Sequence, residues 1–95
     1  MDKNNFSHCE SLESVRAKID DIDSEILSLI EKREHCVIQI ANIKKQLSDF
    51  PAYYVPEREL EIISRVEKNY KGNFAPGVIG GIFQIIIQNC RILQK

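Results

Sequence analysis

The chain has 95 residues, of which 43% are hydrophobic and 28% are charged, a size and composition typical of one small globular domain. Thirteen lysines and arginines against fourteen aspartates and glutamates leave a net charge of -1. This balance excludes the strongly basic surface that non-specific nucleic-acid binding needs, so we expect no nucleic-acid partner and only a local anion site.

A membrane partner is not expected either. The longest apolar run, around Ile85–Ile87, is far too short to span a bilayer. The first ten residues are polar and lack the apolar core of a signal peptide. The sequence therefore predicts a cytoplasmic protein.

Cysteine usage agrees with this compartment. Cys9, Cys36 and Cys90 form no CxxC pair, and two of them fall on apolar helix faces, so we expect free thiols. Two cysteines follow histidines, at His8 and His35, but neither pair has partners at the spacing of a tetrahedral metal site. We expect no metal and no other cofactor.

The first predicted element is a long helix that follows a loose lead over residues 1–10, with a helical domain over residues 11–95. Ser11 is a candidate N-cap, with Glu13 in the first turn, where a negative charge suits the helix dipole. From there to Leu47, steps of three and four residues alternate without a slip, which predicts one continuous helix. We call these eleven positions the seam: Leu12, Val15, Ile19, Ile22, Ile26, Leu29, Arg33, Cys36, Ile40, Ile43 and Leu47.

The length of this helix predicts a dimer. At about 1.5 Å per residue, about 36 residues make a rod of roughly 54 Å. A compact domain of this size should be only about 32 Å across, from its expected radius of gyration. The rest of the chain can cover only part of such a rod, so we expect a second copy to cover the remainder.

Proline separates the first helix from a second one. Pro51, in the linker Ser48–Val55, cannot continue a helix, whereas Pro56 is preorganised for a helix start. The second helix is predicted over Pro56–Tyr70, with Lys71-Gly72 as its stop signal. Its apolar stripe consists of Leu60, Ile63, Val66 and Tyr70.

A third helix is predicted from Pro76 to the end of the chain, nearly apolar all round and therefore sandwiched between other helices. Gly80 and Gly81 each cost about 1 kcal/mol relative to alanine, so a close backbone approach is expected there. The sequence thus predicts an all-α fold of three helices, one very long and two shorter. The expected buried face of the third helix is Ile79, Phe83, Ile86, Cys90 and Leu93.

Arg33 is the one charged position of the seam and suggests an anion site. Lys44 lies eleven residues on, about 20° around the helix and about 16 Å along it, so both face the same side. The gap between them suits a small polyanion, unless Lys44 only snorkels at the edge of the seam. Arg16 points roughly 100° away, so it could join this site only across a dimer. Otherwise it pairs with Asp20 on the surface.

Two more polar groups lie at helix ends. Arg58 and Glu59 begin the second helix, where a solvated arginine and a carboxylate at the positive end of the dipole would explain them without a site. Cys90 and Gln94 are i and i+4 on the buried side of the third helix. A neutral amide there can donate a hydrogen bond without adding charge, unless it frays with the last turn.

Four segments, in this order and at these spacings, resemble the all-helical class of chorismate mutase: VRAKIDDIDSEILSLIEKR, IANIKK, YYVPERE and IFQIIIQNCRILQ. The match runs from Leu12 to Gln94. It implies an intertwined homodimer of three-helix chains with two active sites, each built from both chains. It also implies the rearrangement of chorismate to prephenate in phenylalanine and tyrosine biosynthesis, without a cofactor.

The resemblance assigns a role to three cations of the long helix, Arg16, Arg33 and Lys44. Arg33, together with Arg16 from the partner chain, would bind the two carboxylates of chorismate. Lys44 and Gln94 would hydrogen-bond the ether oxygen of the breaking bond. Catalysis would then come from holding the reactive conformer and from fixed donors where negative charge develops.

Further binding residues follow from the same resemblance. Glu59 would hold the ring hydroxyl with help from the backbone of Val55, and Arg58 would add positive charge to the pocket. Cys90 stands where the family usually has serine, and a thiol is a weaker donor for a carboxylate. Val55 stands where some members carry aspartate.

Two other functions fit the same residues. An isochorismate-pyruvate lyase resembles this family in fold and site and also works by a pericyclic step. A helical dimerisation module without catalysis would need only the seam. The chain ends one residue after Gln94, as expected of a stand-alone enzyme and equally of the mutase domain of a bifunctional prephenate dehydratase.

Overall fold

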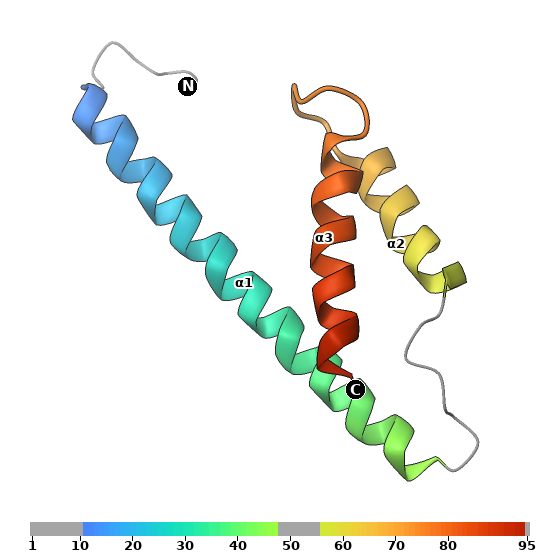
Figure 1. The fold of residues 1–95 in the computed structure, drawn as a ribbon. Helices are drawn as coiled ribbons and strands as arrows, with labels where there is room; N and C mark the ends of the chain where they lie inside the picture. Colours follow the sequence, from blue (N-terminus) through green and yellow to red (C-terminus); the bar gives the residue numbers. More distant parts are fainter. Residues whose placement is uncertain (1–10, 48–55, 95) are drawn as a thin grey trace. The chain divides into compact units, whose positions relative to one another are not determined.

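The computed structural model describes residues 11–47 and 56–94, which form three helices. Figure 1 shows the course of each helix. This confirms the predicted all-α fold with one long helix and two shorter ones. The predicted lead and linker lie outside the described residues. The helices are α1 (Leu12–Gln46), α2 (Pro56–Asn69) and α3 (Val78–Leu93).

The chain divides into two compact parts, residues 1–33 and 34–95, and each is described by itself. The first part contains the longer share of α1. The second part contains the end of α1 together with α2 and α3, and α2 packs against α3. The packed core belongs to this second part.

Ser11 caps α1 as predicted. Its Oγ accepts a hydrogen bond from the backbone N–H of Ser14 at 3.0 Å, and its carbonyl oxygen accepts one from Val15 at 3.1 Å. The side-chain acceptor satisfies an N–H group that no helical carbonyl can reach. From this cap α1 continues for 35 residues and ends one residue before the predicted Leu47.

The apolar seam is exposed throughout the first part of the chain. Its exposed fractions run from 38% at Val15 to 66% at Leu12. A row of large apolar side chains along one helix face is the kind of surface that marks an interaction site. The residues of this row are Leu12, Val15, Ile19, Ile22, Ile26 and Leu29.

In the second part, the buried face of α1 differs from the predicted seam. Val37 and Ala41 are buried, whereas the seam residues Ile40 and Ile43 are exposed. The buried line steps by four residues after Arg33, toward the side of α1 from which Lys44 bonds to Gln94. This end of α1 therefore has two apolar faces, one covered by its own chain and one exposed. The core of the second part is Val37, Ala41, Ile62, Ile87 and Cys90.

α2 is rotated relative to its predicted stripe. Ile62 is buried, Ile63 and Val66 are half-buried, and Leu60 is exposed. Two residues along a helix turn the side chain by about 200°, so burying Ile62 turns Leu60 away from the core. The prediction for Leu60 was wrong because several apolar residues on α2 could have faced α3, and packing selected among them.

The start of α3 was also predicted wrongly. Pro76 lies in a turn before the helix, in which the N–H of Val78 donates to the carbonyl oxygen of Ala75 at 3.2 Å. Gly77 has a φ of 91° and a ψ of -15°, which with the preceding proline makes a type II turn. Proline is as well suited to this turn as to a helix start, so its presence alone did not distinguish the two.

A contact with Glu67 explains why residue 80, one of the two helical glycines, has no side chain. Glu67 Oε2 on α2 accepts a hydrogen bond from the Gly80 N–H at 2.7 Å, and a Cβ at Gly80 would collide with that carboxylate. The expected close approach is therefore made by a side chain and not by backbone. A Cβ at Gly81 would meet nothing within 4 Å in the described chain, so the prediction fails there.

Candidate functional site

Lys44 on α1 and Gln94 at the end of α3 meet in the second part of the chain. Lys44 Nζ donates a hydrogen bond to Gln94 Oε1 at 3.3 Å, and both side chains are half-buried. The two residues lie 50 positions apart, so the contact ties α1 to the C-terminal turn of α3. Both were predicted site residues, and the fold brings them together.

The chemistry of this pair favours an oxygen ligand. Because Gln94 Oε1 accepts from Lys44, the amide NH₂ group is directed elsewhere and keeps its two hydrogens for other acceptors. The ammonium group of Lys44 has three N–H donors. Two donors, one charged and one neutral, are thereby held next to each other.

The register of α1 positions the lysine. Val37 and Ala41 are buried and precede Lys44 by seven and three residues, so all three lie on one face of the helix. Packing at these two positions fixes the helix face from which the lysine projects. Arg33 is half-buried and lies four residues before Val37, also on this line.

Cys90 lies one turn before Gln94 on α3. It is buried in the core of the second part, at 6% exposure. Its position on the same face as Gln94 follows the predicted i and i+4 spacing. A thiol is therefore next to the Lys44–Gln94 pair along the helix.

A second polar pair joins α2 to the same turn of α3. Arg91 Nη2 donates to Glu59 Oε1 at 2.7 Å and to Oε2 at 3.0 Å, and Arg91 Nε donates to Oε2 at 3.2 Å. The two side chains are 33% and 20% exposed, respectively. Glu59 was a predicted site residue, whereas sequence reasoning missed Arg91. The available signal was that Arg91 is the single charged residue of α3.

The remaining predicted residues are not brought into these contacts. Arg58 is exposed and forms an ion pair with Glu61 at 2.8 Å on the surface of α2. Arg16 is exposed in the first part of the chain. Val55 lies outside the described residues.

The charges at the end of α3 favour an anionic ligand. Lys44 and Arg91 contribute two cations, Glu59 contributes one carboxylate, and Gln94 is neutral. Two cations and one carboxylate leave these side chains with a net charge of +1. Half-burial of these groups strengthens their electrostatic interactions compared with bulk water.

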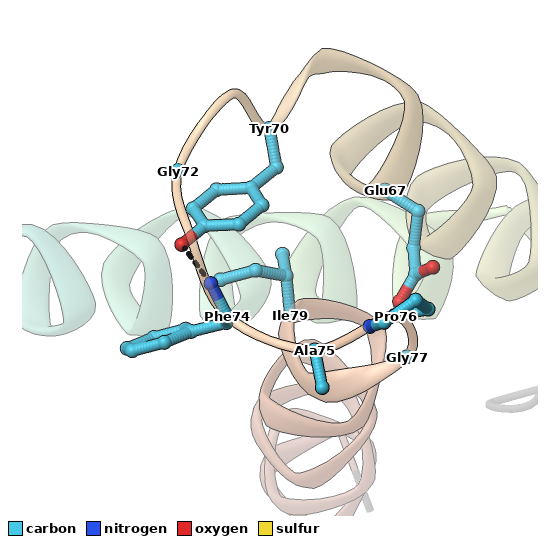
Figure 2. A pocket seen from close by; sticks show the side chains of 8 residues that line it. All are labelled: Glu67, Tyr70, Gly72, Phe74, Ala75, Pro76, Gly77 and Ile79. Atoms are coloured by element: carbon cyan, nitrogen blue, oxygen red, sulfur yellow. Dashed lines mark hydrogen bonds between the residues drawn. The ribbon is translucent and has the colours of Figure 1, made fainter.

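Figure 2 shows a different pocket, at the connection between α2 and α3. It has a volume of about 220 Å³, below the usual range for small-molecule sites. Tyr70 Oη accepts a hydrogen bond from the Phe74 N–H at 3.0 Å on its wall, and the two rings stack at 5.9 Å. Because α3 is about 24 Å long, this pocket lies far from Gln94 and contains none of the predicted site residues. Its lining is Glu67, Tyr70, Gly72, Phe74, Ala75, Pro76, Gly77 and Ile79.

Residues 11–47 and 56–94 contain neither a cluster of metal ligands nor a membrane-spanning helix. No three histidine, cysteine, aspartate or glutamate side chains gather there as ligands for a metal ion. None of the three helices is both long enough and apolar enough to pass through a lipid bilayer.

Comparison with known proteins gives a consistent family assignment. The family model described as chorismate mutase type II matches residues 15–95. The chorismate mutase of Methanocaldococcus jannaschii is 42% identical over 87 residues, which cover 90% of this chain and 86% of that protein. A solved structure of chorismate mutase from Helicobacter pylori in complex with prephenate has a TM-score of 0.75 and 30% identity, covering 87% of this chain and 88% of that one.

Longer relatives contain a similar segment. The bifunctional chorismate mutase/prephenate dehydratase of Pseudomonas aeruginosa is 28% identical over 89 residues. These cover 90% of this chain but only 24% of that protein. The chain therefore spans about a quarter of the length of such bifunctional relatives.

Proposed function

The chain belongs to the chorismate mutase type II family, and we propose on this basis that it rearranges chorismate to prephenate. The observation that carries the proposal is the contact between Lys44 and Gln94. It holds a charged and a neutral donor together at a point where an oxygen of a dianionic substrate can accept from both. This is the step of phenylalanine and tyrosine biosynthesis that the resemblance predicts.

The reaction needs positioning and electrostatics from the protein. It is an intramolecular pericyclic rearrangement, so the substrate supplies both the bond that breaks and the bond that forms. The protein accelerates it by holding the folded conformer, in which the reacting carbons approach each other. Lys44 and Gln94 donate to the ether oxygen, where negative charge grows as the C–O bond breaks.

Arg33 and Arg16 bind the two carboxylates of the substrate in this proposal. The half-buried position of Arg33 supports its part. Arg16 lies seventeen residues earlier, about 25 Å along α1, so it serves the site of a second copy. The proposed enzyme is therefore an intertwined homodimer with two shared active sites, and the exposed seam of α1 supports it.

Glu59 accepts a hydrogen bond from the ring hydroxyl of chorismate in this proposal. The backbone of Val55 assists it, and Arg58 adds positive charge to the pocket. Cys90 takes the place of the family's serine beside a carboxylate, with a weaker hydrogen bond. The half-buried carboxylate of Glu59 supports this arrangement.

An assay of two substrates tests the proposal against the closest rival. Purified protein is incubated separately with chorismate and with isochorismate, and the products are separated by chromatography. The proposal predicts prephenate from chorismate and no release of pyruvate from isochorismate. Consumption of isochorismate with chorismate left intact would assign the chain to the lyases of the same fold.

A non-catalytic dimerisation module is the second candidate, because the exposed seam alone would serve it. Arg33→Leu discriminates between the two. A module should be stabilised or unharmed by an apolar residue at this position. An enzyme should keep its helical circular dichroism spectrum and lose turnover of chorismate.

The proposal covers the mutase step alone, because the chain spans about a quarter of its bifunctional relatives. A prephenate dehydratase activity in the same polypeptide is not part of it. The domain bounds 11–95 and the cytoplasmic location stay predictions.

A further inference from the structure

Arg91 and Glu59 form a two-point ion pair between α3 and α2. We propose that Arg91 is a positioning residue, which holds the Glu59 carboxylate where it accepts a hydrogen bond from the ring hydroxyl of chorismate. The inference rests on the function proposed above, since it deepens the part assigned to Glu59.

The geometry of the pair fixes the plane of the carboxylate. A single hydrogen bond would let a glutamate side chain rotate about its terminal bonds. Arg91 instead contacts both oxygens through Nε and Nη2, at 2.7 to 3.2 Å. The guanidinium group is planar, so bonds to both oxygens set the direction of the carboxylate as well as its position.

The contacts leave room for a substrate hydroxyl. Glu59 Oε2 accepts from both Arg91 nitrogens, whereas Oε1 accepts from Nη2 alone. A carboxylate oxygen has two lone pairs, so Oε1 keeps one for a further donor. A substrate hydroxyl that donates to Oε1 would therefore bind without displacing Arg91.

A second ion pair of α2, which lies on its surface, provides a comparison for the Arg91–Glu59 pair. Arg58 and Glu61 are 56% and 68% exposed and share one 2.8 Å contact three residues apart. Such pairs contribute little because water and salt screen them. The Arg91–Glu59 pair is 33% and 20% exposed and joins two helices, so its geometry is held more firmly.

The position of Arg91 links it to the proposed ether-oxygen site. The Gln94 N–H donates to the Arg91 carbonyl oxygen at 3.2 Å, so both residues belong to the last turn of α3. One turn of helix thus carries the donor at the ether oxygen and the anchor of the carboxylate at the hydroxyl. This turn therefore sets the spacing between the protein groups that bind the ether oxygen and the ring hydroxyl of the substrate.

Arg91→Met tests the inference, because it keeps an unbranched apolar stem like that of arginine and removes the guanidinium group. The chorismate kcat/KM should fall about 10- to 100-fold, the loss typical of a misplaced binding group. Arg91→Lys should recover part of this loss, since it keeps one charged donor. Arg65→Met, at an exposed arginine of α2, is the matched control and should leave kcat/KM unchanged.

Two comparisons separate positioning from other roles. In a Glu59→Gln background, adding Arg91→Met should change kcat/KM by less than about twofold, because the residues act as one unit. With chorismate methylated at its ring hydroxyl, wild type and Arg91→Met should also agree within about twofold. A purely structural role would lower turnover of both substrates alike.

Several results would overturn the inference. Full kcat/KM on chorismate in folded Arg91→Met would remove the positioning role, and so would equal losses on both substrates. If the losses in kcat/KM from Glu59→Gln and Arg91→Met multiply in the double variant, Arg91 would act on the substrate independently of Glu59, and the positioning role would be excluded. If Arg91→Met does not fold, the same comparisons are made with Arg91→Lys. A wild type that leaves chorismate unchanged would overturn the proposed function, and this inference with it, in a separate measurement.

Discussion

Lys44 and Lys45 are adjacent residues of α1 with different surroundings. Lys44 is half-buried and bonded to Gln94, whereas Lys45 is exposed. We expect Lys44→Ala to lower kcat/KM for chorismate by about 100- to 1000-fold, as removal of a preorganised donor does. Lys45→Ala is the matched control and should stay near wild type. Equal activity in the two variants would exclude Lys44 from the reacting centre.

Gln94 can be tested through the pH dependence of the rate. Gln94→Glu replaces a donor that works at any pH with a carboxylic acid that donates only when protonated. An unperturbed glutamate has a pKa of about 4.3, so activity should be retained at low pH and lost as the pH rises through this region. The pH profile of kcat/KM checks this, with wild type measured at each pH. A flat profile in the variant would remove Gln94 from the ether oxygen.

Single residues differ in how far the sequence could predict them. Lys44 was predictable because its helix register relative to Arg33 can be counted along one helix. The ion pair of Arg91 was not, because its partner Glu59 lies 32 residues away on another helix. Only the rotation of α2 on α3 decides which side chains meet there. The proposed substrate roles stay predictions until activity is measured.

At the scale of elements, helix existence was easier to predict than helix faces. The period of the apolar residues and the prolines predicted three helices, one long and two shorter, as observed. The face of α1 that its own chain buries near the end of the helix was not predicted, because two apolar lines diverge after Arg33. Val37 and Ala41 lie on one line, and Ile40 and Ile43 on the other. Periodicity alone cannot decide which of two apolar faces of a helix the chain will bury.

The turn before α3 gives a stability prediction. Gly77 has a φ of 91°, which a residue with a Cβ adopts only with strain. We expect Gly77→Ala to lower the free energy of unfolding by about 1 kcal/mol or more, measured by urea denaturation. Gly81→Ala is the control inside α3, where a Cβ meets no neighbour in the described chain. It should not destabilise, since alanine favours the helix by about 1 kcal/mol. An unchanged free energy of unfolding in Gly77→Ala would contradict this prediction and would mean that the turn can relax.

At the scale of the whole molecule, the seam links fold to function. In the first part of the chain its apolar side chains are exposed, and near the end of α1 they stay exposed while another face is buried. A second copy that covers the seam would bring the partner's Arg16 to the cations of this chain. The length of α1 alone predicted a partner, and both the second copy and its arrangement stay a proposal.

Mixing two inactive variants tests the central claim, an active site shared by two copies, most directly. Arg16→Ala and Lys44→Ala chains are unfolded together, refolded at equal amounts and assayed with chorismate. Half of the dimers should be mixed, each with one intact site of two, so about a quarter of wild-type activity should return. Each variant refolded alone is the control and should stay inactive. No recovery of activity, although exchange of chains is verified by mass spectrometry, would contradict the shared site.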